Sequence, residues 1–379
     1  MAKEYVMQFR DLKTQYNVLK PRIDKAIAEV LESSAFILGK PVVDLENTLA
    51  EYVGKKHCIG CGNGTDALQL ALMAWDVGPG DAVFTSDFTF FASAGAASIL
   101  GATVILVDID PRTFNISAEA LEAAIQRVLE EGKLTPKVII PVDLFGLPAD
   151  YDKIDVIAKK YQLKILEDGA QGLGGSIRGK KACSFGDMAT TSFFPAKPLG
   201  CYGDGGAIFT DDDDIDARLR SLRAQGKSPT DKYDNREFGM NSRLDTLQAA
   251  ILLPKFEAFV EYELDNVNRV ASWYTERLEK HFVTPYIPQG FYSSWAQYTL
   301  ILEDQTEREA IRQKLQEEQI PSMVYYPRGL HQQKAYEKMG WSDELFSNTI
   351  KAVQTVLSLP MHPYLTEDDV ERVCKALLK

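Results

Sequence analysis

The sequence has few cysteines, no long apolar run and no excess of positive charge, and each shortage excludes a class of protein. Its 379 residues include five cysteines, which are scattered and do not resemble a disulfide framework. No apolar run approaches the ~18 residues of a membrane-spanning helix, and the first residues lack a signal-peptide pattern. We therefore expect a cytoplasmic protein with no membrane partner.

Positive charge is outnumbered along the chain. Lysine and arginine together number 42 and aspartate and glutamate 54, which gives a net charge of −12. Such a balance argues against nucleic acid as a partner. An anionic ligand must then be held by local groups.

The nearest approach to a metal motif is the pair Cys58 and Cys61. A metal or redox site needs a second ligand pair nearby, or a helix that starts at the first cysteine. Neither is present, and the pair lies on an expected strand that runs into a glycine loop. We expect no metal.

What the sequence does contain is an alternation of short β-rich runs with helical patterns between residues 57 and 210. Runs that are apolar on both faces are typical of strands covered on both sides. The pattern predicts an α/β fold with a mostly parallel seven-stranded sheet. The expected strands are His57–Gly60, Ala82–Ser86, Thr103–Val107, Lys137–Pro141, Lys164–Glu167, Ala189–Phe193 and Gly206–Thr210.

The chain after the sheet region predicts a second, smaller domain. A long helix is expected over Leu244–Arg277, bent at Pro254. Strands are expected at Ala296–Leu302 and Ser322–Tyr326, and helices at Thr306–Glu318 and Thr366–Leu378. We therefore expect a large α/β domain over residues 1–254 and a small α+β domain over residues 255–379.

Lys197 is the most informative residue. It is the only lysine or arginine between Lys181 and Arg218, and it stands among apolar and glycine residues. Low-dielectric surroundings disfavour the charged amine, which lowers its pKa and makes it a nucleophile. A lysine of this kind can form a Schiff base with an aldehyde cofactor such as pyridoxal 5′-phosphate. An exposed lysine on a glycine-rich loop is the alternative.

A glycine-rich loop, Gly60-Cys61-Gly62-Asn63-Gly64-Thr65-Asp66, joins an expected strand to an expected helix. Glycines let the backbone approach a ligand, and the helix N-terminus offers free N–H groups to a phosphate. A dinucleotide-binding loop would need glycine at Thr65. A simple helix-capping turn is also possible.

Further polar residues stand at expected strand ends. Asp168 ends an apolar strand, and a buried carboxylate there needs a partner such as a protonated pyridine nitrogen. Ser192 is placed to contact a phosphate, and an aromatic of the Asp87–Phe91 run to stack on a ring. Asn241 and Arg243 precede the long helix and can bind anions. Helix capping, core packing and surface ion pairing are the alternatives.

Together these residues resemble the DegT/DnrJ/EryC1/StrS family of sugar-nucleotide aminotransferases over nearly the whole chain. The matching segments are Asp11-Leu12, Phe36–Gly39, Asn63–Leu68, Glu167–Gln171, Ser192–Lys197, Gly203–Ala207, Asn241–Asp245, Tyr326-Pro327, Leu330-His331 and Leu357–Pro363. The resemblance implies a type I fold of pyridoxal-phosphate enzymes, similar to aspartate aminotransferase.

The resemblance also implies roles for single residues. Lys197 would form the internal aldimine and move the proton, Asp168 would hold the pyridinium and Gln171 would lie near the ring hydroxyl. Phe90 matches the stacking aromatic. The phosphate cup matches Gly64, Thr65 and Ser192. Asn241 would reach the phosphate of the neighbouring subunit, which implies a homodimer, and the sugar nucleotide would meet Arg243, Tyr326 and His331.

The chain departs from the family pattern at a few positions. Gly172 and Leu173 follow Gln171 where many relatives have alanine and histidine, and Asp143 stands where histidine or serine is common. Tyr325 stands where a His-Tyr-Pro motif often begins. These changes bear on the choice of sugar more than on the cofactor. A related branch carries histidine in place of the lysine and performs dehydration, and Lys197 speaks against it.

The sequence therefore predicts a pyridoxal-phosphate aminotransferase that moves an amino group from L-glutamate to a keto sugar nucleotide. The resemblance is nearest to enzymes that aminate UDP-2-acetamido-2-deoxy-3-oxo-glucuronate for bacterial surface polysaccharides. Amino transfer to another UDP- or dTDP-keto sugar is the first alternative. A Rossmann-type oxidoreductase and a catalytically silent sensor of pyridoxal phosphate or nucleotide sugar are further ones.

Overall fold

A seven-stranded sheet forms the centre of the computed structural model, which describes residues 7–228, 230–231 and 233–378. Its strand order is β1-β9-β8-β5-β4-β2-β3, and β9 runs in the opposite direction to the other six strands. The prediction of a mostly parallel sheet is confirmed. The strands are β1 His57–Cys61, β2 Asp81–Ser86, β3 Thr103–Val107, β4 Thr135–Ile140, β5 Lys164–Asp168, β8 Met188–Ser192 and β9 Gly206–Thr210.

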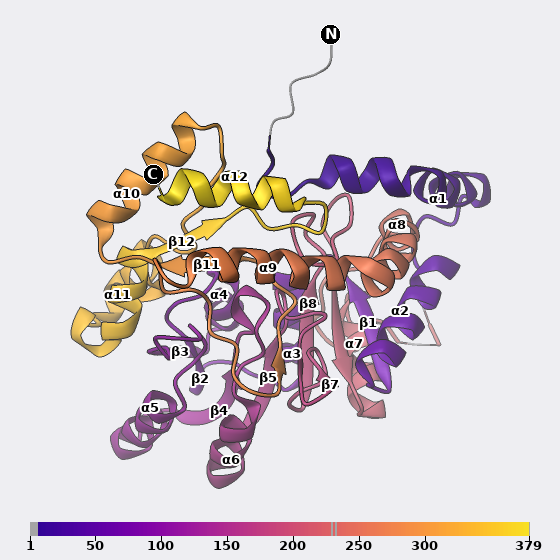
Figure 1. Cartoon of the computed structure of the whole chain (residues 1–379). Helices are drawn as coiled ribbons and strands as arrows, with labels where there is room; N and C mark the ends of the chain where they lie inside the picture. The colour runs from indigo at the N-terminus through magenta and orange to yellow at the C-terminus, as the bar shows by residue number, and fades with distance from the viewer. Residues whose placement is uncertain (1–6, 229, 232, 379) are drawn as a thin grey trace.

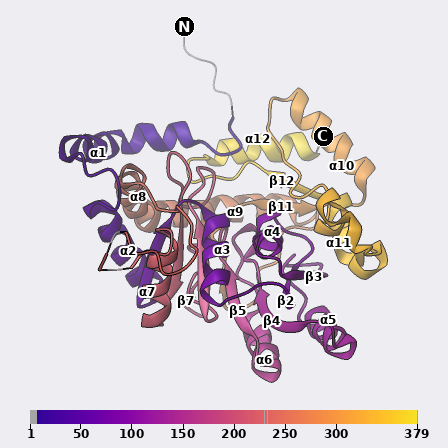
Figure 2. The same ribbon diagram turned by 180° about the vertical axis from the view of Figure 1, so that it is seen from behind.

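Alternation of side chains along the strands gives the sheet two apolar faces, each covered by helices. Val83, Val138 and Leu166 pack on one face with helices α3 (Gly64–Ala74), α4 (Ala92–Ile99) and α7 (Asp213–Leu222), which Figure 2 shows in front of the sheet. The neighbouring Phe84 and Ile139 pack on the other face. That face is covered by α2 (Lys40–Val53), α5 (Ala118–Glu131), α6 (Tyr151–Tyr161) and α8 (Thr246–Ala258).

A second group of elements lies beside the sheet domain. The long helix α9 (Leu264–Leu278) crosses above the sheet in Figure 1, with α12 packed along it. A two-stranded antiparallel sheet joins β11 (Tyr298–Ile301) to β12 (Val356–Leu359). The chain's beginning packs here too, because Met361 N–H donates to the Phe9 carbonyl at 3.1 Å. The remaining helices are α1 Leu12–Ser33, α10 Gln305–Glu317, α11 Ser347–Thr355 and α12 Glu367–Leu378, and the remaining strands are β6 Ser176–Ile177, β7 Lys180–Lys181 and β10 Phe291–Tyr292.

The expected helix over Leu244–Arg277 is interrupted. Helix α8 accommodates Pro254, and the break is a π-helical turn at Phe259–Glu263, before α9 begins. In this turn Glu263 points inwards, where it accepts hydrogen bonds from Gln15 Nε2 at 2.9 Å and from the Tyr364 hydroxyl at 2.5 Å. The turn thus brings a carboxylate to buried polar partners, a tertiary effect that the hydrophobic pattern does not reveal.

Other elements also differ from expectation. The segment Ser322–Tyr326 is not a strand but makes one bridge, from Met323 to Ser358. The strand that pairs with β11 is β12, which the sequence pattern did not predict. Helices α7 and α11 were also not predicted. Helix α7 begins at an acidic first turn capped by Asp212, whose side chain accepts from Asp214 N and Ile215 N.

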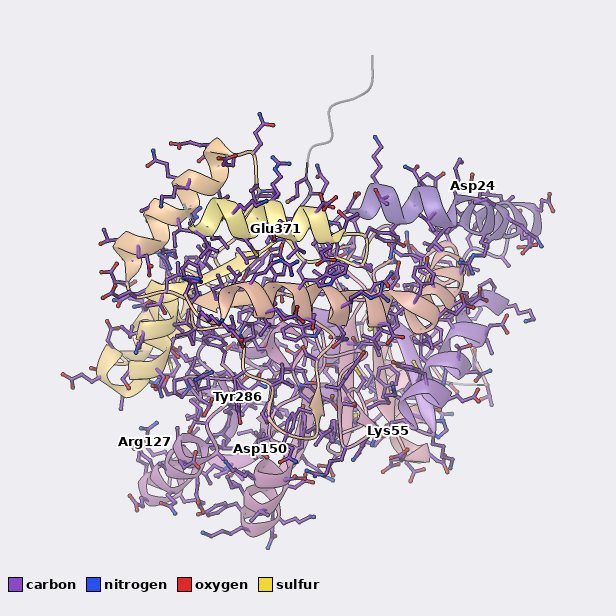
Figure 3. All side chains as sticks on the ribbon, viewed as in Figure 1. Asp24, Lys55, Arg127, Asp150, Tyr286 and Glu371 are labelled. Atoms are coloured by element: carbon purple, nitrogen blue, oxygen red, sulfur yellow. The ribbon has the colours of Figure 1, made fainter. Side chains whose placement is uncertain are left out.

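The expected domain boundary between residues 254 and 255 lies inside α8 and stays a prediction. Charged side chains such as Asp24, Arg127 and Asp150 lie towards the outside of the ribbon (Figure 3). Within the described part of the chain, no helix has both the length and the apolar character needed to cross a membrane.

Candidate active site

Several polar residues meet where the parallel strands β2, β4, β5 and β8 end. Asp87 follows β2, Asp168 ends β5 and Ser192 ends β8. The carboxyl ends of parallel strands share one edge of a sheet, where open α/β folds bind their ligands. The predicted site residues therefore gather along one edge of the sheet.

Asp168 lies at the bottom of this site with 4% of its surface exposed. Its Oδ2 accepts a hydrogen bond from Ser93 Oγ at 2.7 Å, and its Oδ1 accepts one from Ala170 N at 3.2 Å. Burial raises the pKa of the carboxyl, although both hydrogen bonds and the Lys197 amine act in the opposite direction. A cationic partner would therefore stabilise the ionised form of Asp168. Ser93, on α4, was not predicted from the sequence.

Lys197 lies in the turn after β8, where its N–H donates to the Phe194 carbonyl at 2.8 Å. Its side chain is half-buried, and burial lowers the pKa of the amine, with Arg10 acting in the same direction and Asp168 against it. The two groups are therefore close enough to shift each other's pKa. The free amine that a nucleophilic lysine requires is favoured here.

Arg10 supports the lysine turn by hydrogen bonds and was not predicted from the sequence. Its Nη2 donates to the Lys197 carbonyl at 2.8 Å and to the Pro198 carbonyl at 3.3 Å. These bonds tie a residue near the start of the chain to the turn that carries the amine.

The glycine loop lies against Ser192 and the first turn of α3. Asn63 caps this helix by accepting from Asp66 N at 2.8 Å, and the first amides of a helix have no partner within it. A Cβ on Gly64 would lie 2.7 Å from the Ser192 Cβ, so only glycine lets loop and serine approach this closely. Gly64, Thr65 and Ser192 thus form a cup suited to a phosphate.

Gln171 joins the sheet edge to the second group of elements. Its Oε1 accepts from Phe145 N at 2.7 Å, and its Nε2 donates to the Tyr326 hydroxyl at 3.2 Å. Burial raises the pKa of the Tyr326 hydroxyl well above its ordinary value, and the charge of Asp168 adds to this effect. Tyr326 therefore lies in the same site as Asp168 and stays a hydrogen-bonding hydroxyl.

Phe90 is 57% exposed on the loop that follows β2, as a ring that stacks on a ligand must be.

His331 lies behind this loop, and both of its ring nitrogens are within hydrogen-bond distance of a carboxylate. Its Nδ1 is 2.6 Å from Asp87 Oδ2 and its Nε2 is 2.9 Å from Asp343 Oδ1. Although burial opposes it, these two carboxylates raise the pKa of the imidazole. His331 is thus a buried link between loops in this structure.

Asn241 and Arg243 lie next to the glycine loop. Arg243 Nη2 donates to Asn241 Oδ1, and Asn241 is exposed. Between them Ser242, which was not predicted, accepts from Gly62 N at 2.9 Å and donates to Asp66 Oδ2 at 2.6 Å. This serine fixes the segment to the phosphate cup.

The residues of this site fit pyridoxal phosphate. The cup that a Cβ on Gly64 would fill suits the phosphate, and the buried acid suits the ring nitrogen. The Lys197 amine, with its lowered pKa, suits the aldehyde. These three features lie along one sheet edge, as the parts of one cofactor require.

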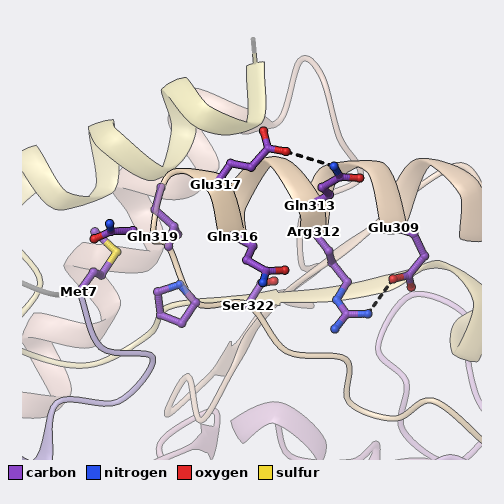
Figure 4. Close-up of a pocket in the computed structure, with 10 residues that line it drawn as sticks. Met7, Glu309, Arg312, Gln313, Gln316, Glu317, Gln319 and Ser322 are labelled. Atoms are coloured by element: carbon purple, nitrogen blue, oxygen red, sulfur yellow. Dashed lines mark hydrogen bonds and ion pairs between the residues drawn. The ribbon is translucent and has the colours of Figure 1, made fainter.

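A separate groove lies on α10, away from the sheet edge. It is lined by Arg312, Gln316 and Gln319 with Met7 and Ser322 (Figure 4). None of the predicted site residues lines it. This groove is therefore separate from the candidate site.

The chain is similar to known proteins over nearly its whole length. The model of the DegT/DnrJ/EryC1/StrS aminotransferase family matches residues 17–378. A Pseudomonas aeruginosa protein named UDP-2-acetamido-2-deoxy-3-oxo-D-glucuronate aminotransferase is 45% identical over 98% of this chain and 99% of its own. A Geobacillus stearothermophilus protein named pleiotropic regulatory protein is 43% identical over 97% of this chain and 96% of its own.

Solved structures agree in fold and cofactor. A DegT/DnrJ/EryC1/StrS aminotransferase from Brucella abortus superposes with a TM-score of 0.95 at 44% identity, over 98% of both chains. NtdA from Bacillus subtilis, solved with bound pyridoxamine phosphate, has a TM-score of 0.87 at 29% identity, over 100% of this chain and 86% of its own. The fold is type I and the cofactor is pyridoxal phosphate. The chain belongs to the DegT/DnrJ/EryC1/StrS aminotransferase family.

Proposed function

We propose that the protein transfers the amino group of L-glutamate to a keto sugar nucleotide, with both half-reactions at the sheet edge. The observation that carries this proposal is the pairing of Lys197 with Asp168. Burial lowers the pKa of the amine and raises that of the acid, and each charge acts on the other. Groups with opposed shifts in one site are typical of acid–base chemistry.

Each residue of the site takes one task in this proposal. Bound pyridoxal phosphate supplies the electron sink. Lys197 holds the cofactor and afterwards carries the proton, while Asp168 keeps a proton on the ring nitrogen. Phe90 covers one face of the ring, and Gln171 lies at its hydroxyl. Gly64, Thr65 and Ser192 hold the phosphate.

For the sugar we propose UDP-2-acetamido-2-deoxy-3-oxo-glucuronate, the compound in the name of the Pseudomonas aeruginosa relative. Arg243 is a cation near the cup and can pair with a carboxylate or a diphosphate. Tyr326 offers a hydroxyl beside Gln171. Because both nitrogens of His331 are occupied by carboxylates, we propose that it acts on the sugar indirectly, by holding the loop of Phe90.

We further propose a homodimer with shared active sites in the cytoplasm. Large apolar side chains are exposed on segments that carry or border the site, and exposed patches of this kind favour association. Asn241 is exposed beside them, where it can reach a neighbouring subunit. The five cysteines are free and buried, in keeping with a reducing compartment. The exposed apolar residues are Phe36, Ile37, Leu38, Phe90, Phe194 and Phe238.

The first test is spectroscopic. Purified protein loaded with pyridoxal phosphate is expected to show an absorbance band that borohydride bleaches and glutamate converts. Lys197→Ala should lose the covalent attachment, whereas Lys255→Met should keep it. Lys255 is a suitable control because burial lowers its pKa as well, to about 8. If Lys197→Ala kept a cofactor adduct that borohydride bleaches, the proposal would be wrong.

The second test identifies the sugar. The pyridoxamine form is mixed with a panel of UDP- and dTDP-keto sugars, and return of the original spectrum with one of them names the substrate. Return with a sugar other than the 3-oxo-glucuronate would replace the proposed substrate. A protein that binds the cofactor but shows no spectral change with glutamate would instead be a sensor.

The third test concerns the shared site. Lys197→Ala and Asn241→Ala subunits are each expected to be inactive. Mixed and allowed to exchange, they should recover about a quarter of wild-type activity, since half of the dimers then contain one intact site. No recovery from subunits that do exchange would mean that each site is built within one chain.

A further inference from the structure

Two buried carboxyl groups lie next to Asp168 and belong to no step of the proposed reaction. Glu167 precedes Asp168 on β5, and Asp143 follows β4, with its N–H donating to the Asp168 carbonyl at 3.1 Å. Neither Asp143 nor Glu167 has any exposed surface. Leaving two charges in such a place is costly unless each is compensated.

The hydrogen bonds to the two groups are unequal. Glu167 accepts from Cys183 N at 2.5 Å on one oxygen and from Phe185 N at 2.7 Å on the other. Asp143 Oδ1 accepts from Ala149 N at 3.0 Å and from the Tyr151 hydroxyl at 2.9 Å. Asp143 Oδ2 is buried and has no hydrogen-bond partner among the described residues. One carboxylate oxygen thus lacks a donor.

Among the described residues, the groups with the largest effects on this pair include no cation. The titratable groups that face it are Tyr151, Cys183 and Asp168, besides the two carboxyls themselves. Burial raises the pKa of Asp143 to about 6, and burial together with the Asp143 charge raises that of Glu167 well above its usual range. Two acids this close titrate as one unit.

We propose that Asp143 and Glu167 share a single proton and act as one negative charge behind Asp168. A proton between the two carboxyls gives Asp143 the donor that it lacks and removes the repulsion of two adjacent anions. The remaining charge supports the proton on the ring nitrogen through Asp168, while a second charge would raise the pKa of Asp168 further. Asp143 and Glu167 are thus positioning residues, and this consequence rests on the proposed role of Asp168.

Gly172 makes room for this arrangement. A Cβ at this position would lie 2.3 Å from Asp143 Oδ2 and 2.6 Å from its Cβ, which no side chain tolerates. The absence of a side chain at Gly172 thus admits the Asp143 carboxyl.

The proton can be detected directly by infrared difference spectroscopy of the purified protein, with or without bound cofactor, at about pH 8, where ordinary carboxyls are ionised. Wild type is expected to show the carbonyl band of one protonated carboxyl group, absent from both Asp143→Asn and Glu167→Gln. Absence of the band from wild type, or its persistence in both variants, would overturn the proposal. This measurement does not depend on what the enzyme acts upon.

A second test measures the charge of the pair. Its readout is the pH at which the absorbance change of the bound cofactor is half complete. Each single variant keeps one negative charge and should leave the midpoint unchanged, whereas Asp143→Asn/Glu167→Gln should move it to lower pH by about one unit. If either single variant alone moved this midpoint by about one pH unit, both groups would be ionised in wild type. Asp152→Asn, at an exposed ion pair with Arg178, is the matched control. A protein that binds no pyridoxal phosphate refutes the proposed function alone, since the infrared result still decides the shared proton.

The packing of the pair is tested separately. Gly172→Ala is expected to lower the melting temperature by several degrees, and Gly172→Ala/Asp143→Gly, which removes the Asp143 Cβ as well as its carboxyl, should recover part of the loss. A Gly172→Ala protein as stable as wild type would contradict the contact. Equal loss in the double variant would contradict the pairing of the two positions.

Discussion

Ser93 holds Asp168 through a hydrogen bond of 2.7 Å, from a helix that covers the sheet to the acid at the end of its central strand. The serine is 1% exposed, so water does not compete for the bond. The bond favours the ionised form of Asp168, which burial disfavours. Ser93 therefore helps to decide how well Asp168 can pair with a protonated ring.

Removing this bond is expected to reduce catalysis. Ser93→Ala should lower kcat/KM about tenfold, which corresponds to about 1.4 kcal/mol, because a hydrogen bond to a buried charge contributes on that order. Steady-state kinetics with glutamate measure the effect. Ser98→Ala is the control on the same helix, since it loses a bond to Tyr336 but lies away from the acid. Equal losses in both variants would point to damage of the helix.

Loss of the Arg10 guanidinium is expected to loosen the lysine turn. Arg10→Ala should lower the free energy of unfolding by about 2 kcal/mol and speed the release of pyridoxal phosphate, because two carbonyls lose their donor. Arg10→Lys should recover only part of the lost stability, because an ammonium lacks the planar, forked set of donors of a guanidinium. Arg22→Ala, which removes an exposed pair with Glu257, should change neither quantity. Unaltered cofactor release in Arg10→Ala would contradict the support of this turn.

The phosphate cup predicts a sharp response to a single methyl group. Gly64→Ala places a Cβ 2.7 Å from the Ser192 Cβ and should raise the Kd for pyridoxal phosphate at least about tenfold. Equilibrium titration of the apoenzyme gives the Kd. Gly78→Ala is the matched control, because its nearest neighbour would be at 3.7 Å, an ordinary contact. Unchanged affinity in Gly64→Ala would place the phosphate elsewhere.

The pKa of Asp143 predicts a pH dependence of stability. Its value is about 6 in the folded protein against 3.8 ordinarily, so the folded state binds the proton more tightly than the unfolded state does. The resulting stabilisation is complete below about pH 4 and is lost as the pH rises through about 6. Asp143→Asn lacks this titration. Chemical denaturation across this range should therefore show wild type losing stability relative to the variant, and a constant difference would contradict the raised pKa.

The sheet and the lysine turn could be predicted from the sequence because their signals are local. Each strand is a short apolar run, and Lys197 is the single cation in a long stretch. Ser93 and Arg10 could not be predicted, because their roles depend on contacts with residues 75 and 187 positions away. Sequence places His331 in a family motif, but not between Asp87 and Asp343. The π-helical turn before α9 could not be predicted for the same reason, because it depends on the distant hydrogen-bond partners of Glu263.

The position of β1 in the sheet has a consequence for how the chain folds during synthesis. This strand lies at one edge of the sheet, where β9 is its one partner among the described strands and His57 pairs with Thr210. A ribosome must therefore release the whole intervening α/β region before the first strand finds its neighbour. Until then β1 leaves its hydrogen-bonding edge open to other chains, and we expect nascent protein of this stage to bind chaperones.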